Sequence, residues 1–173
     1  MKNIKVLVPS GVLGLGFDLE AFKSGVKKNP DIISIDGGST DSGPASLGSG
    51  TSKYSRAAIK SEWKVLMKAR EELGVPLVIG SCGTCGTNSM VDWMETITIE
   101  LAKELGQSLK VAKLYCEQNN KFIQKNFLSN KVHPLDPAPF LDSKAIMNMS
   151  HIVALAGAEQ IQEALKTGAD IIL

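Results

Sequence analysis

The stretch PLVIGSCGTCGTNS, residues 76–89, joins a short apolar run to a glycine-rich turn in front of a helix-like segment. The four apolar residues at its start follow one another without alternation, which is typical of a strand that is buried on both faces. Beyond the turn, Met94, Ile97 and Leu101 recur at helical spacing. The stretch therefore predicts a strand, a tight turn and a helix that covers the strand.

The same alternation of strand-like and helix-like segments extends in both directions along the chain. The expected strands are residues 4–8, 32–36, 76–79, 109–116 and 170–173. The expected helices are residues 18–28, two segments that end at Gly74 and Gly106, and residues 118–128 and 158–166. Since each parallel crossover needs a helix, the pattern predicts an open, mostly parallel sheet with helices on both faces, a Rossmann-like α/β fold. We expect a single domain over residues 1–173.

Composition narrows the class of partner. The chain has 173 residues, of which 43% are hydrophobic, and a formal net charge of +1. Near-balanced charge gives no basic face for nucleic acid or an anionic membrane, and no apolar run approaches the ~20 residues of a membrane span. The opening residues lack the pattern of a signal peptide. These features predict a cytoplasmic protein whose partner is a small molecule, with no nucleic-acid or membrane partner.

A second glycine-rich stretch, ISIDGGSTDSGPASLGSG, covers residues 33–50 and holds five glycines and five serines behind an expected strand. Ligands of open parallel sheets bind beyond the carboxyl ends of the strands, so this loop and the turn after residue 79 should meet at one edge. We interpret both as a cradle for a phosphate, carboxylate or acyl oxygen, with a flexible lid or linker as the alternative. The candidate ligand-binding residues are Gly37, Gly38, Ser39, Thr40, Gly43, Gly48, Ser81, Gly83, Gly86 and Asn88.

Two carboxylates in this stretch are the candidate catalytic residues. Asp36 ends an expected strand, and Asp41 follows Ser39 and Thr40. A carboxylate at a strand's carboxyl end, beside many amide donors, is placed to act as a general base or to orient a substrate. The structural alternative is that each aspartate bonds loop amides.

Three cysteines give a second hypothesis. Cys82 and Cys85 form a C-x-x-C motif between a strand and a helix, and Cys116 ends another expected strand. Such thiols serve redox chemistry or bind a metal, although they also occur as small residues of a tight turn. His133 and His151 lack any metal-ligand spacing, so no metal ligands are assigned.

A resemblance adds a family to these observations. The motifs DGGSTDSGPASLGSG, VIGSCGTCGTNSMVDW, LYCEQ and PLDPAP, together with the terminal EALKTGADIIL, resemble the amino-terminal part of the acyclic terpene utilisation protein family. The resemblance implies a catabolic enzyme or pathway component that acts on branched acids, as such or as coenzyme A thioesters. It assigns no cofactor. Because that family's turn after the third strand is built from glycine and alanine, Cys82 and Cys85 depart from it.

Three functions stay open from the sequence. The first is an enzyme domain that binds an anionic or acyl substrate in the glycine-rich cradle, and the second is a thiol site for redox chemistry or metal binding. The third is a noncatalytic small-molecule-binding subunit. The apolar run at residues 170–173 has no helix after it, so we expect a homo-oligomer or the remainder of a longer chain to cover it.

Overall fold

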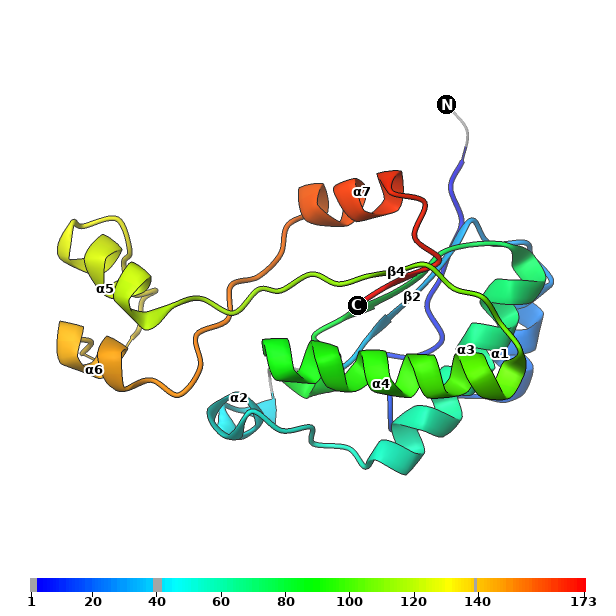
Figure 1. The fold of residues 1–173 in the computed structure, drawn as a ribbon, viewed down its shortest axis with the longest axis horizontal. Coiled ribbons are helices and arrows are strands. Elements are labelled where there is room, and N and C mark those ends of the chain that lie inside the picture. The colour runs from blue at the N-terminus through cyan, green and yellow to red at the C-terminus, as the bar shows by residue number, and fades with distance from the viewer. Residues whose placement is uncertain (1–2, 39–41, 139) are drawn as a thin grey trace.

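The fold is a twisted sheet of five parallel strands with helices on both faces (Figure 1). The computed structural model describes residues 3–38, 42–138 and 140–173. The strands are β1 (Val6–Leu7), β2 (Ile32–Asp36), β3 (Leu77–Gly80), β4 (Val111–Ala112) and β5 (Ile171–Ile172), arranged in the order β1-β2-β3-β5-β4. The predicted Rossmann-like α/β class is confirmed.

Three helices cover one face of this sheet: α1 (Leu19–Val26), α3 (Arg56–Leu73) and α4 (Asn88–Leu105) (Figure 1). Their ends follow the sequence. Asp18 caps α1 by accepting hydrogen bonds from two amides of its first turn, and α3 and α4 end at Gly74 and Gly106, both left-handed. The apolar stripes of these helices form the main core, in which Trp63 is fully buried.

The opposite face carries much less cover. Helix α7 (Ala158–Lys166) lies across it and forms a smaller core with β3 and β5 (Figure 1). This arrangement follows from connectivity, because the chain passes from β3 to β4 on one face and returns on the other to place β5 between them.

The last strand lies inside the sheet. Ile171 pairs with Leu77 of β3 and with Val111 of β4, so neither edge of β5 is open. Both edges of this run are paired because it inserts between two earlier strands. Assembly with another copy or a longer chain stays a prediction.

Two segments differ in detail from the expectation. The glycine-rich stretch contains a short helix that was not expected, α2 (Ala45–Ser49), which ends at the left-handed Gly50. The strand expected at residues 109–116 is shorter than predicted: β4 covers Val111–Ala112, and the Leu114 amide still donates to the Leu173 carbonyl before the chain leaves the sheet.

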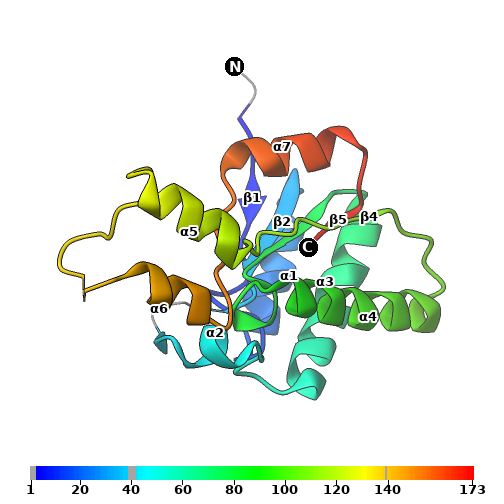
Figure 2. The ribbon, with the colours of Figure 1, turned by 60° about the vertical axis from the view of Figure 1, so that its left-hand side comes forward.

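Between β4 and β5 the chain forms an arm. Helices α5 (Asn120–Leu128) and α6 (Ser143–Asn148) pack against each other and project away from the sheet (Figure 2). The Asn120 side chain links them by donating to the carbonyls of Ile146 and Met149. None of the described helices is both long and apolar enough to cross a membrane.

Candidate functional site

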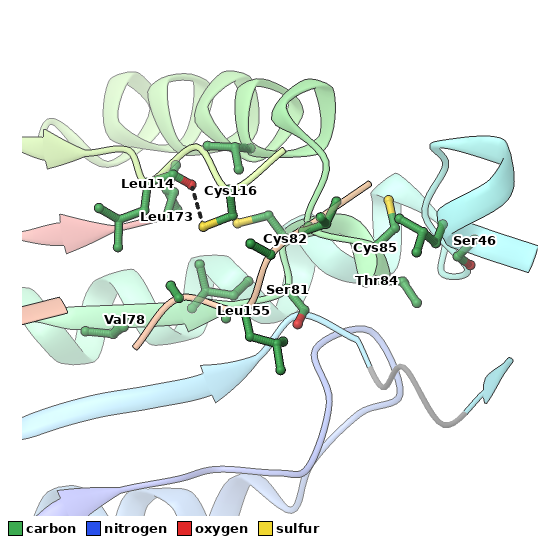
Figure 3. A pocket seen from close by; sticks show the side chains of 18 of the residues that line it. Ser46, Val78, Ser81, Cys82, Thr84, Cys85, Leu114, Cys116, Leu155 and Leu173 are labelled. Atoms are coloured by element: carbon green, nitrogen blue, oxygen red, sulfur yellow. Dashed lines mark hydrogen bonds between the residues drawn. The ribbon is translucent and has the colours of Figure 1, made fainter. Parts of the chain in front are cut away.

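A cavity of about 700 Å³ opens at the carboxyl edge of the sheet, on the face that α7 covers (Figure 3). It lies over the end of β5, between the points where the chain leaves β3 and β4 for opposite faces. Such a switch in direction is where open α/β sheets bind ligands. The cavity is in the size range of small-molecule sites.

The lining of the cavity is neutral. Apolar side chains form most of its wall, and serine, threonine and cysteine side chains supply the rest. No charged side chain lines it within the part of the chain that the structure describes. The apolar side chains include Leu47, Val78, Leu114, Val153, Ile161 and Leu173. The hydroxyl groups belong to Ser34, Ser46, Ser81 and Thr84.

The turn after β3 supplies much of this wall and is tightly wound. Ser81, which precedes the 3₁₀ helix η2 (Cys82–Thr84), and Thr84, its last residue, both adopt left-handed backbone conformations, with φ of 50° and 73°. Residues other than glycine rarely hold such angles, and they cluster at functional sites. Both side chains line the cavity.

The two glycine-rich loops meet, as the sequence predicts. The Gly37 amide donates to the Gly80 carbonyl at 2.6 Å, and the Thr84 amide donates to the Gly37 carbonyl at 3.1 Å. A Cβ on Gly38 would lie 2.3 Å from the Cα of Thr84, so only glycine allows this approach. The first two glycines of the stretch therefore serve the contact between loops.

The structure places the other candidate binding residues in different ways. Gly43, Ser81 and Gly86 line the cavity. The amides of Gly38, Gly48 and Gly86 donate to acceptors within the protein. Gly83 packs against Met90. Ser39, Thr40 and Asp41 lie outside the described residues. Whether this set binds a ligand stays a prediction.

Asp36 and Asn88 make local contacts. The Asp36 carboxylate accepts a hydrogen bond from the Gly38 amide at 2.9 Å, which is the structural role weighed for it. The Asn88 side chain accepts a hydrogen bond from the Glu117 amide at 3.3 Å. Neither side chain lines the cavity. A catalytic role for Asp36 stays a prediction.

All three thiols line the cavity, and the Cys116 sulfur turns toward the Leu114 carbonyl, 3.9 Å away (Figure 3). Burial raises the pKa of Cys82 to about 12, so this thiol stays protonated at neutral pH. A reactive thiol needs the opposite shift. Among the described residues, no group of three or more cysteine, histidine or carboxylate side chains is placed to hold a metal ion.

A histidine–carboxylate pair beside the cavity was missed from the sequence. His151 Nδ1 lies 2.6 Å from Glu117 Oε1, and the other oxygen of Glu117 accepts the amide of Asn88 at the start of α4. Because 34 residues separate the pair, no local spacing indicates it. The antiparallel bridge between Glu117 and Val153 brings the two segments together.

Lys53 is bonded to Thr84 of the cavity lining and does not line the cavity itself, so we describe its position as the rim. The Lys53 amide donates to Thr84 Oγ1 at 3.2 Å, and its ammonium contacts Ser42 Oγ at 3.0 Å. Within the described residues, Lys53 has no carboxylate partner, whereas Arg56 is paired with Glu100. Lys53 is thus available to an anionic group at the mouth of the cavity.

These features define an α/β protein with a largely apolar cavity at the carboxyl edge of its sheet. No protein-family model matches the chain, and no curated protein or solved structure matches it significantly. The resemblance to the acyclic terpene utilisation family therefore stays a prediction.

Proposed function

We propose that this chain is a domain of a catabolic enzyme that binds an acyl substrate with a branched hydrocarbon chain, as the free acid or a coenzyme A thioester. The single observation that carries the proposal is the neutral, mainly apolar lining of the 700 Å³ cavity. Transfer of hydrocarbon from water into such a site is favourable, whereas an isolated charge would lose its hydration there. The lining therefore favours an acyl chain over a phosphate or carboxylate as the buried group.

The residues at the rim favour a ligand whose carboxylate or thioester end lies outside the cavity. Lys53 stands beside Ser42 and Thr84, and Thr84 also lines the cavity. A carboxylate or the phosphates of a carrier would meet this cation while the chain stays inside. The sequence left open whether the ligand is anionic or acyl. In this proposal one amphipathic molecule has both an anionic end and an acyl chain.

Calorimetric titration tests the proposal with dimethyloctanoic acid, decanoic acid and inorganic phosphate as ligands. We expect the branched acid to bind best and phosphate to give no measurable heat. Ala154 lines the cavity and is exposed, so Ala154→Trp should fill the space and abolish binding. The matched control Ala57→Trp alters an exposed position of α3 away from the cavity and should bind as the unchanged protein does. Equal binding by both variants would contradict the proposal.

A thiol function is the second candidate, because three thiols line the same cavity. Replacing Cys82 with alanine and Cys85 with glycine should leave ligand binding intact if the thiols only fill space. Stoichiometric metal in the purified protein, lost in this variant, would favour the thiol function. A noncatalytic binding subunit would bind the branched acid and show no turnover of its thioester.

A further inference from the structure

The pair formed by Glu117 and His151 is held rigidly at the start of α4. Glu117 Oε1 contacts His151 Nδ1 at 2.6 Å, and Oε2 accepts the Asn88 amide at 3.0 Å. The Glu117 amide in turn donates to the Asn88 side chain. Each side chain of the pair is only 23% exposed. Glu117 therefore has one geometry, and it imposes one orientation on the imidazole.

This contact also fixes which ring nitrogen carries the hydrogen. The hydrogen bond from His151 lowers the pKa of Glu117, so the carboxylate is ionised at neutral pH and acts only as an acceptor. Nδ1 must then be the donor, and in the neutral imidazole Nε2 keeps its lone pair. Within the described part of the chain, Nε2 has no hydrogen-bond partner.

Residues next to the imidazole line the cavity, whereas His151, Glu117 and Gly50 do not line it themselves. A Cβ on Gly50 would lie 2.6 Å from Nε2, and Gly50 ends α2, which brings Leu47 to the cavity. On the other side, His151 precedes Val153 by two residues, and Val153 lines the cavity. An unpaired acceptor thus lies just outside the lining of a mainly apolar site, against the end of α2.

We infer that His151 Nε2 is the proton acceptor for the molecule bound in the cavity and that Glu117 is the residue that positions it. The inference rests on the proposed function, since it needs a ligand in the cavity. In the step that it assigns, an O–H bond of the bound molecule or of an attacking water breaks, an N–H bond forms at Nε2, and the oxygen keeps the electron pair. The resulting imidazolium is stabilised by the ionised Glu117.

Two matched ligands test the inference. Dimethyloctanol carries a hydroxyl hydrogen, and its methyl ether has nearly the same shape without that hydrogen. We expect the unchanged protein to bind the alcohol about fivefold more tightly than the ether, the value of one net hydrogen bond. His151→Asn keeps a donor for Glu117 and removes Nε2, so it should bind both ligands equally. The chain's other histidine, His133, is exposed, and His133→Asn should keep the preference.

The outcomes separate the inference from the proposed function. Equal binding of alcohol and ether by the unchanged protein, or a full preference in His151→Asn, would overturn the inference and leave the cavity proposal in place. Binding of neither ligand would overturn the proposed function itself. Should His151→Asn fail to fold, NMR of the histidine ring nitrogens in the unchanged protein decides. The alcohol should then shift the Nε2 resonance of His151, and the absence of that shift would overturn the inference.

Discussion

The two faces of the sheet differ in how much of the molecule they bury. The face under α1, α3 and α4 is packed with fully buried side chains, including Trp63, whose indole donates to Thr98 at 3.0 Å. The α7 face has a small core and the cavity, beside which Leu155 is 93% exposed. We therefore expect stability and ligand binding to depend on opposite faces, so that a side chain affects one property or the other.

The largest expected effect compares a leucine from each face. Leu101 is 0% exposed and Leu155 is 93% exposed. Leu101→Ala should lower the free energy of unfolding by about 2–5 kcal/mol, because it leaves a void in a packed core. Leu155→Ala should change it by less than about 0.5 kcal/mol and should weaken binding of dimethyloctanoic acid. Denaturant unfolding and calorimetry measure the two effects, and a destabilised Leu155→Ala would break the comparison.

The next effect concerns the contact between the two loops. Gly38→Ala should destabilise the fold by about 1–3 kcal/mol, because the added methyl group would overlap the backbone of Thr84. The obstacle to a side chain at Gly38 is therefore the neighbouring loop. Gly48→Ala is the control, since a Cβ there would meet nothing within 4 Å. Equal stability of the two variants in denaturant unfolding would argue against this close approach.

The buried thiol makes stability depend on alkaline pH. Cys82 has a pKa of about 12 in the folded protein, against an ordinary value of 9.0. The unfolded chain therefore releases this proton first, so the contribution of Cys82 is fully present below about pH 9 and is lost as pH rises toward 12. At about pH 10 the loss should be roughly 1.4 kcal/mol.

Other groups also titrate in this range, so the measurement compares unfolding of the unchanged protein with that of Cys82→Ala. The variant should lose less stability between neutral and alkaline pH. Parallel pH profiles would show that Cys82 ionises normally and would reopen the thiol function.

The smallest effect is expected at the rim. Lys53→Met should weaken binding of dimethyloctanoic acid about two- to fivefold, the range of an exposed ion pair, and should leave binding of its methyl ester unchanged. Lys27→Met alters an exposed lysine at the end of α1 and serves as the control. If calorimetry shows that Lys53→Met weakens binding of the acid and the ester equally, Lys53 does not bind the carboxylate of the ligand.

The sequence predicted the layered sheet because strands and helices have local signals. The apolar run at residues 76–79 predicts a strand, and Gly74 and Gly106 predict the ends of two helices. Neither prediction needs knowledge of long-range contacts. The meeting of the two glycine-rich loops was also predictable, because parallel strands end at one edge.

The site itself depends on long-range contacts that have no sequence period. The insertion of β5 between β3 and β4 opens the cavity, and nothing within residues 170–173 indicates its place. His151 meets Glu117 only because an irregular segment returns past β4. The glycine-rich loops were interpreted as a cradle for a ligand, but the amides of Gly37 and Gly38 donate to acceptors inside the protein.

The most direct test of the central claim is a proton–nitrogen correlation NMR titration of the unchanged protein with dimethyloctanoic acid. The cavity draws its wall from separate segments that include Gly86, Leu114 and Val153. Binding in the cavity should shift these amide signals together and leave the exposed arm around Phe122 unchanged. Shifts confined to the arm, or no shifts at saturating ligand, would contradict the claim that the cavity is the ligand site.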